Sequence, residues 1–223
     1  MREIRTGVWH WQAPHAEWSS NAPWGENVSS YGIDEGERLL LFDPIAPPSE
    51  IVELARERET AIVLTAPWHE RDTKSLVEQL GLPVFTPRPD SAQDLMEMYG
   101  ITAEQAGDGS PDLAWLFKEG KGEARPYVAG DRLPVGVQAF PGQKRNDLVL
   151  WVESHNAVIA GDTLVDFGNG LEINPRWLSK AGTTREQVVE GLRMLLDLPV
   201  EHMLATHGGP FDRAALKRAL SSS

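Results

Sequence analysis

The sequence predicts an α+β protein in which two β-sheets pack face to face with helices on the outside, a four-layer αββα sandwich. Three observations support this fold class. The chain opens with a meander of strand-like segments, helix-like segments are spread along it, and from Tyr127 the second half repeats the plan of the first. The 223 residues, 41% of them hydrophobic, can form a sizeable core, so we expect one domain over residues 1–223. Other α+β folds share this pattern, and the loops must distinguish them.

The first half alternates strands with helices. Asp34 and Gly36 supply a tight turn in the opening meander. Ser49 and Asp72 are placed to cap two helices, and Gly81 ends the second of them. The strands predicted here cover residues 5–12, 28–33, 38–43 and 61–65.

The middle of the chain, from residue 91 to about residue 122, has the character of an insertion between the two halves. It begins with the stretch SAQD, a Ser-x-x-Asp pattern typical of a helix N-terminus, and this helix is expected to end at Gly100. The loose connection GDGSPD follows. A second short helix is predicted around LAWLF.

Strand signals return in the second half. They lie in YVAG, VGVQAF, DLVLWVE and AVIAG, each bounded by Gly, Pro, Asn or Asp. Thr183 and Glu186 form a predicted capping box for a late helix with an apolar face. A last strand over residues 202–205 and a helix from about Asp212 complete the predicted fold.

The composition restricts the function classes. The 21 Lys and Arg residues against 33 Asp and Glu give a formal charge of −12, so the surface should repel nucleic acids and anionic membranes. The chain has no cysteine, so any metal must be bound by nitrogen and oxygen atoms. The start MREIRTGVWHW does not resemble a signal peptide, and no apolar run is long enough for a membrane span. We therefore expect a cytoplasmic protein.

Four loops that follow predicted strands carry residues of the kind that catalysis uses. They contain Asp43 in LFDP, His69 in LTAPWHERDTKSL, Asp162 in VIAGDTL and His207 in LATHGGP. A fifth loop, PGQKRNDLVLW over residues 141–151, precedes a strand pair. Loops at one edge of a sandwich are the expected place for an active site.

The order of these loops resembles that of the metallo-β-lactamase superfamily, over nearly the whole chain from SSYGIDEGERLLLFDP to the terminal helix. In that family a T-H-x-H-x-D-H motif, a PGHT loop, a GD pair and an HG pair supply the metal ligands. The pairs are intact here as Gly161-Asp162 and His207-Gly208, but Gln143 stands in place of the PGHT histidine. The resemblance implies the αββα fold and a metal-dependent hydrolase ancestry.

The T-H-x-H-x-D-H motif is degenerate, and two registers are open. With Thr65 as the threonine, the ligand positions hold Ala66, Trp68, Glu70 and Arg71. With His69 as the second histidine, the ligand positions hold Pro67, His69, Arg71 and Asp72. We prefer the first register, because Thr65 ends its strand as in the family. His69 is then a neighbour of the ligand positions.

The surviving ligands implied by the resemblance are Asp162 and His207. His69, Glu70 and Asp72 are further candidates, and we place Trp68, Arg71 and Gln143 in the pocket as non-ligands. Together these donors would hold one zinc, iron or manganese ion. Each residue also has a plainer interpretation: a turn residue for Asp162, a hydrogen-bonded loop histidine for His207, a helix N-cap for Asp72 and a loop-shaping amide for Gln143.

Two functions follow. One is a hydrolase of an ester, thioester, lactone or similar bond in a small molecule, with a reduced metal site. The other is a pseudoenzyme that holds no metal and uses the fold as a scaffold, with Arg71 paired to Asp162 and Glu70 in the metal space. Two firm ligands rarely hold a catalytic metal, which favours the second, whereas the resemblance favours the first. A nuclease is disfavoured by the acidic charge and the lost ligands.

The N-terminal stretch GVWHWQAPHAEWSSNAPW is rich in tryptophan. Trp9 and Trp11 alternate, which favours packing on a sheet face or in a homodimer contact. An aromatic lid over the pocket is the alternative. His10 and His15 are too far from the ligand motifs in sequence to be assigned as ligands.

Overall fold

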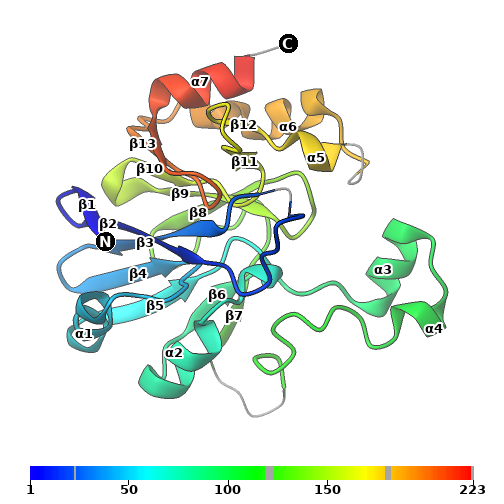
Figure 1. Ribbon diagram of the computed structural model, residues 1–223, viewed down its shortest axis with the longest axis horizontal. Helices are drawn as coiled ribbons and strands as arrows, with labels where there is room; N and C mark the ends of the chain where they lie inside the picture. Colours follow the sequence, from blue (N-terminus) through cyan, green and yellow to red (C-terminus); the bar gives the residue numbers. More distant parts are fainter. Residues whose placement is uncertain (23, 119–122, 179–181, 222–223) are drawn as a thin grey trace.

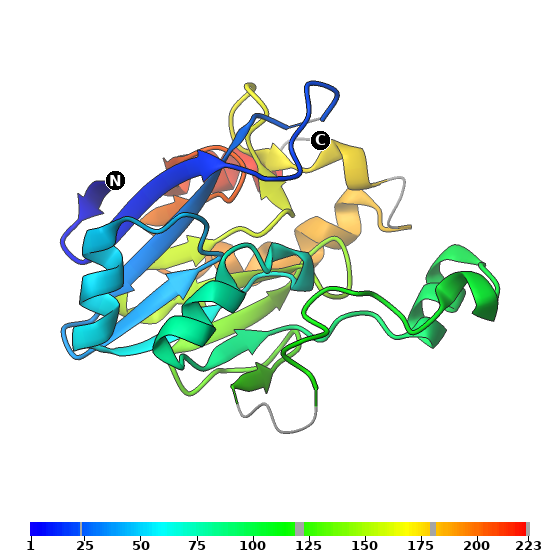
Figure 2. The ribbon, with the colours of Figure 1, turned by 60° about the horizontal axis from the view of Figure 1, so that its bottom comes forward.

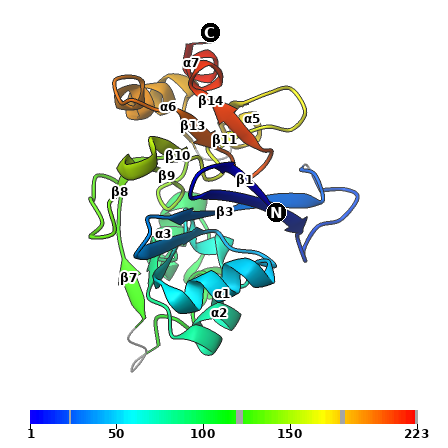
Figure 3. The ribbon, with the colours of Figure 1, turned by 90° about the vertical axis from the view of Figure 1, so that its left-hand side faces the viewer.

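The computed structural model describes residues 1–22, 24–118, 123–178 and 182–221. Two sheets stack face to face with helices on both outer sides (Figures 1 and 3), so the predicted αββα sandwich is confirmed. In the described residues one sheet has seven strands in chain order: β1 (Arg2–Arg5), β2 (Val8–Pro14), β3 (Asn27–Asp34), β4 (Arg38–Phe42), β5 (Glu59–Val63), β6 (Val84–Thr86) and β7 (Ala124–Pro126).

The second sheet has the order β14-β13-β10-β9-β8. Its strands are β8 (Val137–Pro141), β9 (Leu148–Val152), β10 (Ala157–Ile159), β13 (His202–Leu204) and β14 (Pro210–Asp212). A small ribbon pairs β11 (Leu164–Val165) with β12 (Glu172–Ile173). The helices are α1 (Ser49–Glu57), α2 (Thr73–Leu80), α3 (Ala92–Tyr99), α4 (Ala103–Ala106), α5 (Pro175–Leu178), α6 (Arg185–Leu192) and α7 (Arg213–Ser221), with the 3-10 turns η1 (Pro67–His69), η2 (Glu153–His155) and η3 (Arg193–Leu196).

Three apolar layers hold the sandwich together. The inner layer lies between the two sheets and includes Tyr31, Leu40 and Leu150. One outer layer packs α1 and α2 on the first sheet, and the other packs α6 and α7 on the second. Because burial of apolar surface is the main favourable term in folding, this alternation of apolar layers determines the layer order.

Sheet topology brings the functional loops to one edge. Strand β4 runs parallel to β5, and β10 runs parallel to β13. Parallel strands end at the same edge of a sheet, so the residues that follow β4 and β5 lie beside those that follow β10 and β13. Asp43, His69, Asp162 and His207 all come from these four strand ends.

Several element predictions need correction. The LAWLF segment forms turns, because Leu113 has a positive φ of 54° that interrupts a helix. The capping box of α6 is Thr184 with Gln187, one residue later than predicted, since Thr183 donates its hydroxyl to Gln143 O instead. The strand expected in YVAG lies directly before it, at β7. Pro48, and not Ser49, occupies the N-cap position of α1.

The predicted insertion is an arm that projects from the sandwich (Figure 2), and we use "arm" for residues 88–118. It carries α3, with the predicted Ser91–Asp94 capping box, and α4. Arg145 and Asn146 on the body tie its base through Asp90. Residues 119–122, the expected end of the insertion, lie outside the described residues. No described helix has the length and apolarity that crossing a bilayer requires.

Candidate metal centre

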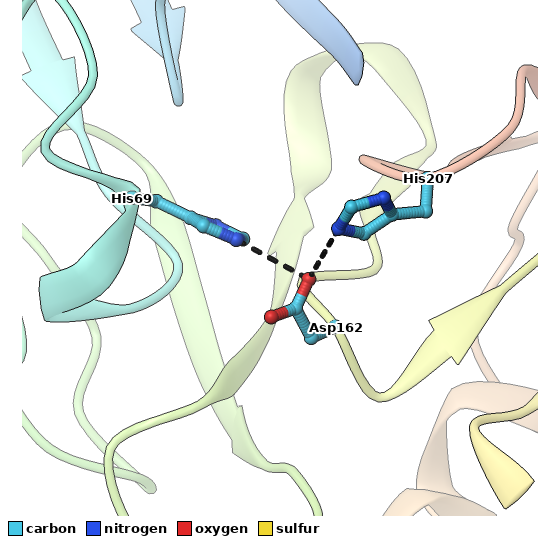
Figure 4. A group of neighbouring side chains, drawn as sticks. All are labelled: His69, Asp162 and His207. Carbon is cyan, nitrogen blue, oxygen red and sulfur yellow. Dashed lines mark ion pairs between the residues drawn. The ribbon is translucent and has the colours of Figure 1, made fainter. Parts of the chain in front are cut away.

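Three side chains converge at the edge where the four strands end (Figure 4). The Nε2 atoms of His69 and His207 each lie 3.2 Å from the same oxygen, Oδ1 of Asp162. One ligand atom from each residue can be chosen so that all lie within 4.8 Å of one another. His69 and Asp162 are buried, whereas the side chain of His207 is 14% exposed and faces the cavity described below.

His69 is oriented by residues behind it. Strand β5 ends at Val63, Thr65 lies in the bend that follows it, and the turn η1 begins at Pro67. Asp43 Oδ2 lies 3.0 Å from His69 Nδ1, and Asp43 in turn accepts from the Thr65 amide at 2.9 Å and the Thr65 hydroxyl at 2.6 Å. A carboxylate on one ring nitrogen fixes the imidazole and directs the other nitrogen, which is the arrangement found behind metal-binding histidines.

Asp162 is held by its main chain and one oxygen. Its amide donates to Asp147 Oδ1 at 2.9 Å, and its Oδ2 accepts from Trp68 Nε1 at 2.9 Å. Gly161 before it has a φ of 56° and lies against Asp147, so a side chain there would clash. Oδ1 is buried and accepts no hydrogen bond of acceptable geometry in the described structure. The one oxygen without a hydrogen bond is therefore the one that faces both imidazoles.

His207 lies in a loop that is clamped on both sides. Thr206 donates its hydroxyl to Gly161 O at 2.7 Å, which joins this loop to that of Asp162. Ser29 donates its hydroxyl to Gly208 O at 2.6 Å. The rings of Trp24 and Phe167 lie 5.8 Å and 5.9 Å from the imidazole. Hydrogen bonds thus fix the main chain on either side of His207, and two aromatic rings lie near its imidazole.

The charges of the cluster are strongly coupled. Burial lowers the pKa of His69, but Asp162 and Asp43 outweigh it and raise the pKa to about 10. Burial raises the pKa of Asp162, but His69 and His207 outweigh it and hold this pKa well below its usual value. Burial and the nearby Asp162 raise the pKa of Asp147 to about 7. Without a metal, His69 is an imidazolium between two carboxylates.

Arg71 does not fill the space between the ligands. The predicted ion pair with Asp162 or Glu70 is wrong, because among the described residues no such pair lies within 4.0 Å. Arg71 has a φ of 44°, and its guanidinium donates to the main-chain oxygens of Ser29 at 2.9 Å and Asp43 at 2.6 Å. The positively charged guanidinium therefore holds two strand ends through main-chain oxygens. The side chain of Arg71 also lines the cavity.

Two of the further candidates lie outside the cluster. Glu70 accepts from the Leu113 amide and from Trp115 Nε1 at 2.7 Å, so it anchors the end of the arm. Asp72 occupies the N-cap position of α2, but its carboxylate accepts from the Ala46 amide and caps no helix amide. Among the described residues neither carboxylate belongs to the group of donors that meets within 4.8 Å, which corrects their assignment as candidate ligands. Of the three further candidates, the structure brings only His69 to the cluster.

Gln143, in place of the PGHT histidine, is also turned away. Its side-chain amide donates to Asn174 O at 2.8 Å, and its main-chain amide donates to the Thr163 hydroxyl. It is buried and does not line the cavity at the cluster, but it lines a second hollow that adjoins this cavity at Trp68, Lys144 and Trp177. Its loop is shaped by Gly142, where a Cβ would overlap the main chain of Asp147.

A cavity of about 530 Å³ opens onto the three convergent residues. Trp24, Trp68, Phe167 and Trp177 supply aromatic walls, and charged side chains such as Glu17 and Arg176 line the rest of the cavity beside the cluster. Lys144 places its ammonium 3.7 Å from the centroid of the Trp177 ring and 4.8 Å from that of Trp68. Such aromatic pockets with a few polar groups are typical of small-molecule sites.

Lys144 and Trp177 were not predicted as pocket residues. Lys144 follows Gln143 in the PGQK loop, where only the histidine position was considered, and Trp177 belongs to no ligand motif. His15 was also left unassigned, although it lines the cavity together with Trp24. Trp24 lines the cavity, as the alternative of an aromatic lid expected. Trp9 and Trp11 instead pack on the first sheet, where Trp11 Nε1 donates to Ile45 O. His10 stacks on Tyr31 away from the cluster.

The donor set fits one metal ion. Two imidazole nitrogens and a carboxylate oxygen are the ligands that zinc, iron and manganese accept, and the Asp43 contact supplies the usual support behind a histidine ligand. The buried Oδ1 of Asp162, without a hydrogen bond, is the atom that such an ion would contact.

No protein-family model and no curated protein matches the sequence. Among solved structures, the chain is similar to TTHA1623 in a di-iron-bound form, with 26% identity, a TM-score of 0.53 and coverage of 86% of this chain and 93% of that one. It is also similar to the metallo-β-lactamase superfamily protein ST1585 from Sulfolobus tokodaii, with 14% identity, a TM-score of 0.61 and coverage of 96% and 84%. The DIM-1 metallo-β-lactamase matches with 10% identity, a TM-score of 0.63 and coverage of 98% and 94%. The chain therefore has the metallo-β-lactamase fold.

Proposed function

We propose that this protein is a metal-dependent hydrolase in which His69, Asp162 and His207 hold a single metal ion. The observation that carries the proposal is the convergence of two imidazole Nε2 atoms on the one buried oxygen of Asp162 that accepts no hydrogen bond. Three protein donors with room for a further ligand are the usual composition of a catalytic zinc site.

The bond cleaved is of the ester, thioester or lactone type in a small molecule. A bound ion would supply Lewis acidity and a water of lowered pKa. The chain itself would position the substrate: Trp68 and Trp177 form an aromatic wall, and Lys144 presents a positive charge between them. His69 keeps its Nδ1 on Asp43, so its Nε2 has a fixed direction toward the cavity.

Zinc, iron and manganese all suit this donor set. The likeness to TTHA1623, whose structure is described as di-iron-bound, supports testing iron beside zinc. The ion count proposed here is one, because within the described residues only one group of three such donors meets within 4.8 Å.

Elemental analysis after purification in zinc, manganese and iron tests the proposal. We expect about one ion per chain in the wild type and none in His207→Ala. His202→Ala is the matched control, since His202 lies on the same segment, on β13, outside the cluster. A wild type that holds no ion in any of the three media overturns the proposal.

Hydrolysis is tested separately with phenyl acetate, S-phenyl thioacetate and a γ-lactone. Activity should require the metal, disappear on dialysis against a chelator and return on adding the ion back. His202→Ala should keep it, and His207→Ala should lose it. If the protein binds metal but hydrolyses none of these esters, thioesters or lactones, the proposed metal site stands and the proposed hydrolysis is refuted.

One observation favours a second function, that of a metal-free scaffold. The His69 imidazolium lies between Asp43 and Asp162, so it offsets part of their negative charge without an ion. In that case the wild type would contain no metal and His207→Ala would change neither metal content nor ligand binding. The same elemental analysis therefore separates the two functions.

A further inference from the structure

A second groove adjoins the candidate metal cavity. It has a volume of about 870 Å³ and lies between the arm and the sandwich. Trp68, Lys144 and Trp177 line both hollows, so the two share a wall at these three side chains. A ligand at the metal cavity that extends past this wall enters the groove. We call it the arm groove.

The arm side of the groove is an apolar helix face. Leu95, Met98 and Tyr99 of α3 line it, and their spacing of three and four residues places them on one side of the helix. Met98 is 46% exposed and Tyr99 57% exposed, and α3 has no buried residue. Large apolar side chains gathered along a groove are typical of a binding surface.

The charges of the groove select against an anionic occupant. Asp90, Asp94, Glu97 and Asp112 line it. Arg145 pairs with Asp90 at 3.1 Å and with Asp94 at 2.7 Å and so neutralises part of this charge. The acids that remain repel phosphate or carboxylate groups. A neutral apolar chain meets the aromatic wall on one side and the α3 face on the other.

We propose that the arm groove binds the apolar tail of an elongated acyl substrate, whose scissile carbonyl lies in the metal cavity. The substrate class is a neutral ester or thioester with a medium or long acyl chain. The position of the carbonyl rests on the proposed function, but the binding of the tail does not. Trp68, Lys144 and Trp177 form the junction between the two parts of the ligand.

The kinetic test compares phenyl acetate with phenyl octanoate, which differ only in acyl length. We expect kcat/KM to rise about tenfold or more with the longer chain, because each buried methylene group adds to binding. The double variant Leu95→Ser, Met98→Ser should lose this dependence and keep the rate on phenyl acetate. Met194→Ser, at a residue 62% exposed on η3 outside the groove, should keep both.

The binding test needs no metal and no reaction. Calorimetry of chelator-treated protein with N-phenyloctanamide and N-phenylacetamide, the amide analogues of the two esters, should show tighter binding of the longer one by about tenfold or more. His207→Ala should retain this preference, and the double variant should lose it. Thermal unfolding of the double variant should match the wild type, because neither replaced side chain is buried.

The outcomes separate this proposal from the proposed function. A chain-length preference in binding without any metal or hydrolysis supports the groove and refutes the hydrolase. Hydrolysis with no chain-length preference, together with equal amide binding by wild type and double variant, overturns the groove and leaves the hydrolase.

Discussion

At the scale of single residues, the position of His69 decides how the centre is interpreted. The preferred register of the degenerate motif made it a neighbour of the ligand positions, yet its imidazole faces Asp162. The register aligns the motif with the sequence one residue at a time and assumes that the chain continues in one conformation. Here the chain enters the 3-10 turn η1 at Pro67, which changes the direction in which the following side chains point. Backbone direction after a strand is not encoded in motif spacing, so this residue could not be assigned from the motif.

Asp162 and His207 were expected from the resemblance, because its GD and HG pairs are intact and follow strands that are plain in the sequence. The roles of Glu70 and Asp72 could not be predicted, because the partners that hold their carboxylates lie in distant segments. The Glu70 partners are Leu113 and Trp115 in the arm. Long-range hydrogen bonds of this kind leave no local pattern.

Asp43→Asn tests the support behind His69. Asparagine tolerates the φ of 44° at position 43 and has nearly the shape of aspartate. The change therefore removes chiefly the negative charge that faces His69 Nδ1. We expect metal affinity to fall about 10- to 100-fold, as measured by competition with a chromophoric chelator. Asp197→Asn, at an exposed carboxylate, is the control. Equal affinity in the two variants would show that Asp43 does not orient the ligand.

At the scale of elements, close packing of the loop after β8 positions the wall of the cavity. Gly142 lies against the main-chain oxygen of Asp147 and the hydroxyl of Thr163. Gly142→Ala should therefore destabilise the fold by about 2 kcal/mol, because an added methyl group forces main-chain atoms apart. Gly25→Ala, where a methyl group meets nothing, should leave the melting temperature nearly unchanged in the same thermal unfolding experiment.

Strand β2 carries a pH-dependent contribution to stability at His10. Burial and then the charges of Arg2 and the N-terminus lower the pKa of His10 to about 4. The unfolded chain, with a pKa near about 6.5, then binds more protons at mildly acidic pH, so stability falls as the pH drops from about 6.5 toward about 4. His10→Gln removes this part of the loss.

The measurement is the difference in melting temperature between pH 7.5 and pH 4.5. We expect a smaller drop in His10→Gln than in the wild type. The remaining drop is due to the carboxylates and to His15, His155 and His202, whose pKa values are also lowered by burial. Equal drops in the two proteins would mean that His10 takes up no proton on unfolding.

At the scale of the whole molecule, the layer order and the presence of an insertion were predictable, and the direction of the arm was not. Alternating apolar strands and amphipathic helices predict two sheets with outer helices, because each apolar face must be covered. The arm has helix caps that are visible in the sequence, Ser91 with Asp94 and Thr102 with Gln105. It enters the core layers only near its end, through Leu113 and Leu116, and not through α3. The direction of α3 depends on a few polar contacts to the body, and these join residues far apart in the chain.

Arg145→Gln tests how the arm is attached. The Arg145 side chain is 57% exposed, so its pairs with Asp90 and Asp94 should contribute little to global stability. We expect an unchanged melting temperature but faster hydrogen exchange in residues 88–118, measured by mass spectrometry. Arg193→Gln, which breaks the similarly exposed pair with Glu190, should leave exchange in the arm as in the wild type.

The hydrogen bond from Trp68 to Asp162 gives the two oxygens of this carboxylate different roles. The indole N–H donates to Oδ2 and uses one of its lone pairs, whereas Oδ1 accepts no hydrogen bond in the described residues. A cation would therefore meet least competition at Oδ1, the oxygen nearest to both imidazoles. Trp68, whose indole cannot ligate a metal, thus acts on the centre by orienting the carboxylate that can.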